Sequence, residues 1–352
     1  MDNDGAFFWG GYRQGRFWGF AQDWYTVESR VILLKGGAGT GKSTLMRRVR
    51  ERWESQGQKT FSFRCASDPD SLDAVCTADR RLCIMDATAP HAVEARFPSA
   101  VERLLDLGAA LDGDRLRAQL PQLTQHRSEQ QLLRLRAGQY LRASAVLAER
   151  EADREDELPS ERALLRCADR LSRHLFDGEQ GDGTDVRAYL TGITPDGEIA
   201  LYDTMTALCP RIFVLEGDAP VAARLMTLLR HRAAMAGVST ISCPCALRPN
   251  CIEHLLIPDA DTAFTVSNPH HAVDFPVYRR LSMERYREKP LTATARRRRR
   301  LFEQTQGELL AEGMRLLAAA RECHRREEEI YGAAMCWEKA DEMLETAWEW
   351  LQ

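Results

Sequence analysis

Residues 30–43 read RVILLKGGAGTGKS. The stretch opens with an apolar run typical of a strand, turns through a glycine-rich segment, and leads at Ser43 into a helical pattern. A strand, a glycine-rich turn and a helix in this order are the context that makes G-x-x-x-x-G-K-[ST], the Walker A pattern, a specific signal. Backbone N–H groups of such a turn, together with the start of the helix, point at phosphate oxygens. The stretch therefore predicts an α/β domain built around a phosphate-binding loop.

The side chains of the loop are of the types that nucleotide chemistry uses. Lys42 is placed to reach the β- and γ-phosphates of a nucleotide, and the Ser43 hydroxyl is placed to bind Mg²⁺. The chain has no Asn-Lys-x-Asp guanine motif, which favours ATP over GTP. The predicted nucleotide-binding residues are Gly36, Gly37, Ala38, Gly39, Thr40, Gly41, Lys42, Ser43 and Thr44.

A second apolar run, at residues 82–85, ends at Asp86. The carboxyl end of a buried strand delivers side chains to the loop edge of the sheet, so Asp86 is predicted to hold Mg²⁺ together with Ser43. The aspartate could instead cap the next segment. Ala87 follows it, so the acidic neighbour that many ATPases use to orient attacking water is missing from its usual place.

The segment CASDPDSLD offers substitutes for that missing carboxylate. It follows a presumed strand at residues 60–64, so Asp68 and Asp73 should emerge at the same sheet edge. Glu94 is a further candidate, and ordinary turn and cap chemistry is the alternative explanation for the two aspartates. The strand at 60–64, between the loop and Asp86 in the chain, favours the additional-strand branch of P-loop ATPases. The candidate catalytic residues are Lys42, Asp86, Asp68 and Asp73.

Residues 212–226 read IFVLEGDAPVAARLM and have the same outline as the loop region. From Leu45 onward the chain repeats 180 positions later, with Cys65 recurring as Cys245, Gly57 as Gly237 and His91 as His271. We interpret the second half as a copy of the first. The histidine recurs in the second copy although the catalytic residues do not, which favours a structural role for it.

The second copy lacks the residues that a P-loop site uses to bind phosphate and Mg²⁺. Gly41, Lys42 and Ser43 align with Val221, Ala222 and Ala223, and Asp86 aligns with Val266. The fold class predicted is therefore α/β, with two tandem P-loop NTPase-like three-layer αβα domains, each with a helical appendage, the second copy being degenerate.

A Gly/Asp-rich stretch at residues 178–185 marks the boundary between the two copies. We expect a nucleotide-binding domain at 1–180 and a degenerate domain at 181–352. The first should carry an antiparallel helical hairpin at about 114–177, and the second should end in helices at about 296–352.

The composition excludes several classes of protein. The net charge of the 352 residues is −4, which gives no whole-protein field for nucleic acid or an anionic membrane. The arginine run at 296–300 could meet phosphates, but a solvated helix face is favoured. No stretch is long and apolar enough to span a membrane, so a soluble, cytoplasmic protein is expected.

The ten cysteines indicate reduced thiols in a cytosol and not a disulfide framework. Cys243, Cys245 and Cys251, with His254 nearby, have the atoms that zinc prefers but not the paired C-x-x-C spacing. Buried structural thiols are the favoured interpretation. Nine aromatic residues within the first 25 could stack on a ring ligand or a partner, although a hairpin packed on its own domain is favoured.

The stretches KGGAGTGKS, CASDPDSLD and DATAPH together resemble a bacterial family of tandem P-loop ATPase-like proteins. In that family similar stretches read as a phosphate loop, C-S-S-D-P-D-S-L-D and D-G-T-A-P-H. The resemblance implies a site at residues 36–43 and Asp86, with Asp68 and Asp73 as further members, and it implies no particular substrate. The chain departs from the family pattern at Ala87 and in the second loop.

Three functions remain open from the sequence. The first is a slow Mg·ATP-dependent ATPase whose silent half acts as a built-in pseudo-dimer partner, with Arg224 or Arg248 reaching across as an arginine finger. The second is a small-molecule kinase in which Asp68 and Asp73 bind the acceptor. The third is a nucleotide-operated scaffold whose helices bind a protein partner. In the kinase the helical hairpin would be a lid carrying Arg115, Arg117 or Arg127.

Overall fold

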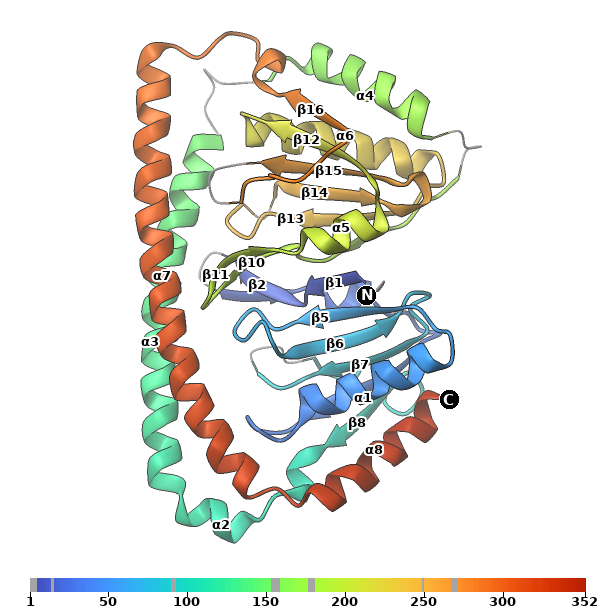
Figure 1. The fold of residues 1–352 in the computed structure, drawn as a ribbon, viewed down its shortest axis with the longest axis vertical. Coiled ribbons are helices and arrows are strands. Elements are labelled where there is room, and N and C mark those ends of the chain that lie inside the picture. Colours follow the sequence, from blue (N-terminus) through green and yellow to red (C-terminus); the bar gives the residue numbers. More distant parts are fainter. Residues whose placement is uncertain are drawn as a thin grey trace.

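The computed structural model describes residues 5–13, 16–89, 93–152, 159–176, 181–248, 250–267 and 271–352. Two six-stranded sheets lie one above the other (Figure 1). The first has the order β1-β5-β6-β7-β4-β8 and the second β9-β13-β14-β15-β12-β16. The first sheet comprises β1 (Gly5–Phe8), β4 (Arg30–Lys35), β5 (Thr60–Arg64), β6 (Leu72–Thr77), β7 (Leu82–Asp86) and β8 (Glu102–Asp106). The second comprises β9 (Asp185–Arg187), β12 (Arg211–Glu216), β13 (Thr240–Pro244), β14 (Ile252–Ile257), β15 (Thr262–Ser267) and β16 (Arg279–Ser282).

The two sheets agree strand by strand. In each sheet one strand runs antiparallel to both of its neighbours. This strand is β6 in the first sheet and β14 in the second. The irregularity in pairing after Phe63 has its counterpart after Cys243, 180 positions later. The fold class predicted from the sequence, two tandem α/β domains of the P-loop type, is confirmed.

The order of the strands corrects one expectation. β4, which leads into the loop, pairs directly with β7, which ends at Asp86. β5 lies beyond β6 on the far side of β7. No strand separates the loop strand from the Asp86 strand, so the strand at 60–64 does not support the additional-strand branch.

Each sheet has one face covered by two helices. α1 (Lys42–Ser55) and α8 (Trp337–Leu351) pack on the first sheet, and α4 (Glu161–Leu175) and α6 (Ala219–Met235) pack on the second. Apolar side chains alternate along the strands, so Ile32 and Leu34 face the helices while Val31 and Leu33 face the other way. The opposite faces of the two sheets contribute to a single core between the halves.

That shared core contains the aromatic N-terminal segment. The segment forms the hairpin of β2 (Gly10–Arg13) and β3 (Arg16–Gly19), and the buried Trp24 lies 4.7 Å from the ring centroid of Phe63. From the second half come Tyr189, the hairpin of β10 (Thr191–Thr194) and β11 (Gly197–Ala200), and α5 (Tyr202–Leu208). The backbone N–H of Phe8 donates to the carbonyl of Tyr189 at 2.7 Å, so the halves are joined by main chain as well as by side chains.

Two long helices run antiparallel along one side of both sheets (Figure 1). α3 (Leu120–Ala152) follows the short α2 (Gly113–Ala118) and packs along α7 (Ala293–Ala333). Gly313 allows the close approach, because a Cβ there would lie 2.8 Å from Cδ2 of Leu141. One turn after Leu141 on α3, the Ser144 hydroxyl donates to the carbonyl of Gln306 on α7.

The long helices carry the chain from one half to the other, and this corrects the predicted hairpin. α3 delivers α4 to the second sheet, and α7 returns the chain so that α8 covers the first sheet. The helices expected to pair with each other, α3 and α4, therefore pack on α7 and α6. A helical sequence pattern indicates an apolar face but not the partner that covers it, which is why the hairpin was wrong.

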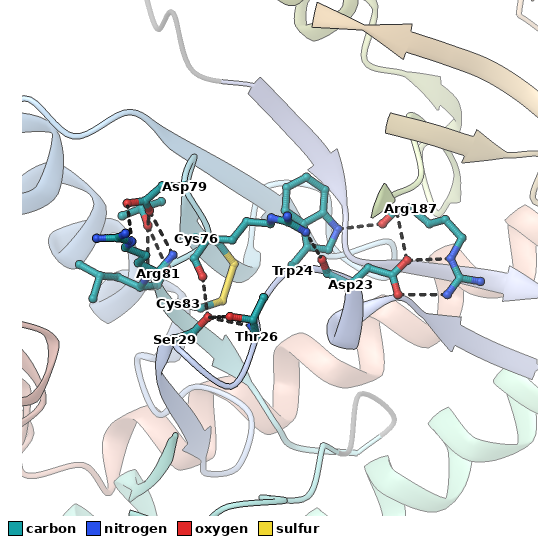
Figure 2. The surroundings of a disulfide bond; sticks show 12 residues. Asp23, Trp24, Thr26, Ser29, Cys76, Asp79, Arg81, Cys83 and Arg187 are labelled. Atoms are coloured by element: carbon teal, nitrogen blue, oxygen red, sulfur yellow. Dashed lines mark hydrogen bonds and ion pairs between the residues drawn. A yellow bond between two sulfur atoms is a disulfide. The ribbon is translucent and has the colours of Figure 1, made fainter. Parts of the chain in front are cut away.

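One pair of cysteines differs from the expectation of reduced thiols. Cys76 on β6 and Cys83 on β7 are direct partners in the antiparallel register, with their Cα atoms 4.2 Å apart, and the structure joins them as a disulfide (Figure 2). Alternating strand faces place the two side chains on the same side, a proximity that the seven-residue separation alone does not reveal. No helix in the described part of the chain is long and apolar enough to cross a membrane.

Candidate functional site

The loop between β4 and α1 has the backbone that its glycines predict. Gly36, Gly39 and Gly41 have φ angles of 153°, 68° and 83°, which residues with a Cβ rarely adopt. The Thr40 hydroxyl donates to the carbonyl of Gly37 at 2.9 Å and closes the turn. α1 then begins at Lys42, so the start of a helix points into the loop.

Lys42 is held inside this loop. Its Nζ donates to the carbonyls of Gly36 at 3.0 Å and Gly37 at 2.7 Å, and lies 3.6 Å from Oδ2 of Asp86. The other oxygen of Asp86 accepts from the backbone N–H of Thr88 at 2.7 Å. The structure therefore brings together the lysine and the strand-ending aspartate that the sequence singled out.

The remaining predicted residues lie at the same edge of the sheet. The Ser43 hydroxyl accepts from the backbone N–H of Leu72 at 3.0 Å, which ties the start of α1 to the start of β6. Asp73 follows on β6, and Asp68 accepts from the Ser71 hydroxyl at 2.6 Å. The pKa of Asp73 is raised well above its usual range, first by burial and then by the like charge of Asp86. Ionisation of Asp73 is therefore less favourable than ionisation of an exposed aspartate.

The side-chain oxygen atoms of Ser43 and of the three aspartates are of the kind that suits Mg²⁺. Carboxylates and a hydroxyl are the hard ligands that this ion prefers. The charges of Asp68 and Asp86 both raise the pKa of Asp73, so the three carboxylates are close enough to repel one another. Among the described residues they are not grouped closely enough to hold a metal ion by themselves, so Mg²⁺ here would depend on the Ser43 hydroxyl and Asp86 together with the phosphates of a nucleotide.

A segment remote in the chain lies on the loop. We call residues 328–337, where α7 ends and α8 begins, the elbow. A Cβ on Gly39 would lie 2.3 Å from the carbonyl oxygen of Glu328 in the elbow. A Cβ on Gly37 would lie 3.1 Å from the ring of Tyr331, and one on Gly41 would lie 3.0 Å from the ring of Trp337. The loop glycines are therefore needed for this contact as well as for their φ angles.

Two side chains of α7 near the site were not predicted. His324 lies 3.6 Å from Glu328, and burial together with the positive charges of Arg134 and Lys42 lowers its pKa to about 4. The pKa of Glu328 is raised, first by burial and then by the charge of Asp68. They lie far from the loop in sequence, and no motif marks them within a long helical pattern.

The predicted arginine fingers do not reach the loop. Arg224 pairs with Glu161 at 2.8 Å on the surface of the second half, and Arg248 lines a cavity there. Of the predicted lid residues, Arg127 lies 3.9 Å from Glu327, whereas Arg115 and Arg117 are on α2. Of the other candidates, Glu94 lies 3.9 Å from Lys35, and His91 is outside the described residues.

The cysteines of the second half do not gather around His254. Cys243 is buried in the shared core and Cys245 lines the cavity. The ring nitrogens of His254 lie 2.9 Å and 2.7 Å from the hydroxyls of Thr191 and Thr265. Within the described ranges, no three His, Cys, Asp or Glu side chains are grouped so that they could hold a metal ion.

Comparison with known proteins identifies one segment. Residues 20–68 match a family model described as an AAA domain. The match spans β4, the loop, α1 and β5, and it marks this segment as a P-loop NTPase element of the nucleotide-binding kind. No curated protein and no solved structure matches the chain.

Proposed function

We propose that the N-terminal half binds ATP with Mg²⁺ through residues 36–44 and hydrolyses it slowly, while the C-terminal half is a partner without hydrolytic chemistry. The observation that carries the proposal is the position of Lys42. Its ammonium group lies in a glycine loop at a helix start, 3.6 Å from the strand-ending Asp86, and the loop lies within the segment that matches the AAA domain.

The residues of the loop have separate tasks in this proposal. Backbone N–H groups of the loop and the start of α1 bind the phosphates, and Lys42 exchanges its carbonyl partners for phosphate oxygens. Ser43 and Asp86 would hold Mg²⁺, which supplies charge neutralisation at the β- and γ-phosphates. Asp68 is the candidate for orienting the attacking water, because it is partly exposed whereas Asp73 is buried.

Two features support a slow reaction. Ala87 stands where a carboxylate would follow Asp86, so no acidic side chain comes directly from β7 to the attacking water. The elbow lies on the loop, so we expect it to shift before the phosphates of a nucleotide reach Lys42. Opening of covering segments limits turnover in many enzymes.

The elbow also favours a second function, that of a nucleotide-operated scaffold. α7 continues from the elbow along α3, so a shift at the loop would be transmitted to the paired long helices. In that case nucleotide binding, and not turnover, would be the useful event. The small-molecule kinase has no observation of this kind in its favour.

The rate of ADP release separates these functions. We expect slow release from the protein with Mg·ATP, abolished in Lys42→Ala and unchanged in Lys59→Ala, whose lysine is exposed and remote from the loop. A mixture of small alcohols, amines and acids should leave the rate unchanged. Strong stimulation by one of them would replace the ATPase by a kinase, and tight binding without release would favour the scaffold.

A further inference from the structure

The second half contains a cavity of about 420 Å³ beside its degenerate loop. Gly217, Asp218 and Pro220 from the loop and the start of α6 form one wall. The first turns of α7 form the opposite wall, and Arg248 comes from the segment after β13. Pockets for small ligands have volumes of about 300–1,000 Å³. The degenerate loop has therefore kept a space of ligand size.

An arginine of α7 takes the place of the lost lysine. Gly217 aligns with Gly36, whose carbonyl accepts from Lys42 at 3.0 Å. The sequence has Ala222 where the second lysine would stand, yet the carbonyl of Gly217 accepts from the guanidinium of Arg299. The cation that the second loop lacks in sequence is thus supplied in space by the run at 296–300.

The acidic side chains of the cavity have partners of their own. Asp218 pairs with Arg287, and Glu303 lies 3.0 Å from Arg299. Glu253 pairs with His271 at 3.1 Å. The two other carboxylates are Glu284, which is exposed, and Glu198, which is half-buried.

Besides Arg299, three arginines remain for a ligand. Among the residues that the structure describes, Arg248, Arg296 and Arg300 have no carboxylate within ion-pair distance. Against the opposing effect of burial, the pKa of Arg248 is raised by its neighbours Cys245 and Cys251 and by the charge of Glu253. Guanidinium groups form paired hydrogen bonds with phosphate, and they are the residues of choice where phosphate is recognised without a metal.

The residues that would bind Mg²⁺ are absent from this half. Ala223 stands in place of Ser43, and Val266 lines the cavity where β15 ends, in place of Asp86. Arginine is therefore the cation that lines this cavity in place of the lysine and the metal ligands of the first loop. The apolar side chains of Leu247, Val266 and Leu291 give the cavity a surface for the organic part of a ligand.

We propose that this cavity binds a phosphorylated organic anion of nucleotide size without a divalent metal. The site is separate from the proposed ATP site and uses different cations. Its ligand would lie between the second loop and the first turns of α7, whose last turns meet the first loop. Occupation of one loop could then be sensed at the other along a single helix.

The test uses the full chain carrying Lys42→Ala, so that the first loop does not contribute. Titration with ADP, and separately with pyrophosphate, is performed in EDTA so that no divalent metal is present. We expect one site per chain for at least one of these probes. Arg299→Ala should weaken it about tenfold or more, because a hydrogen bond to a charged group is worth about 1.5–3 kcal/mol.

A matched pair of variants keeps the test independent of folding. Arg300 lines the mouth of the cavity and Arg297 does not, and both are exposed residues of the same helical turn. Arg300→Glu should weaken binding, and Arg297→Glu should not. Absence of binding in EDTA by both probes, or equal loss in the two variants, would overturn the proposal. Neither outcome bears on Mg·ATP binding by the first loop, which is measured in chains with Lys42 intact.

Discussion

Gly39 shows how much a single residue of the loop has to satisfy. Its φ of 68° could be expected from the Walker A pattern. The position of Lys42 and the succession of β4, the loop and α1 could be expected from it as well. The contact of Gly39 with the carbonyl of Glu328 could not be expected, because the pattern is local and Glu328 lies in the last part of the chain. Local sequence therefore predicted the loop, and not the segment that lies on it.

Replacement of Gly39 by alanine should destabilise the protein in two ways. The left-handed conformation costs roughly 1–2 kcal/mol for a residue with a Cβ, and the new atom would clash with the elbow. Gly57→Ala is the control, because its φ is 80° and no atom lies within 4 Å of the added carbon. Urea denaturation should give a larger loss for Gly39→Ala. Equal losses would show that the elbow does not press on the loop.

Glu198 predicts a pH dependence of stability. Burial, with a smaller contribution from the charge of Glu253, raises its pKa from 4.5 to about 7, while the charge of His271 opposes the shift. The folded state then binds more protons than the unfolded state between these values, so the free energy of unfolding falls as pH rises from about 4.5 to 7. Glu198→Gln should flatten this slope in denaturation measurements at several pH values. An unchanged slope, with Glu284→Gln as the control, would contradict the assignment.

At the scale of elements, the elbow is the feature that the sequence did not reveal. Helical periodicity predicted helices near 114–177 and 296–352, and the structure has α2, α3 and α4 in the first range and α7 and α8 in the second. Their partners were predicted wrongly, because an amphipathic pattern does not specify what covers it. The direct pairing of β4 with β7 places Asp86 beside the loop. This pairing depends on the order of the strands in the sheet, which the helical and strand patterns likewise do not specify.

Trp337→Ala should ease the opening of the elbow. Its ring lies against Gly41, and removing it takes away packing that holds α8 on the loop. We expect the association rate of Mg·ATP to rise several-fold in stopped-flow measurements, with little change in the loop itself. Trp18→Ala is the control, since Trp18 is 51% exposed and Trp337 is 48% exposed. A slower or unchanged rate would mean that the elbow does not limit entry.

At the scale of the whole molecule, the two halves are interwoven. Their sheets share one core, Asp23 pairs with Arg187 across the halves at 2.7 Å (Figure 2), and α4 and α8 are exchanged. The repeat in the sequence predicted two copies of one fold. It could not predict the exchange, because the two exchanged helices, α4 and α8, lie outside the repeated stretch.

The interweaving predicts that neither half folds alone. A fragment of residues 1–180 lacks α8, so the apolar face that Leu344 and Leu351 cover would be open to water. We expect this fragment to be unfolded by circular dichroism, and to fold when it is produced together with 181–352. The intact chain should unfold in one calorimetric transition. Two separate transitions, or a fragment folded by itself, would contradict the shared core.

The central claim is that Mg·ATP binds at the first loop and nowhere else in the chain. Calorimetric titration with Mg·ATP, repeated in EDTA, counts the sites that depend on magnesium. We predict one such site per chain, lost in Lys42→Ala and retained in Arg299→Ala and Lys59→Ala. A magnesium-dependent site that survives Lys42→Ala, or two such sites in the unaltered chain, would contradict the account.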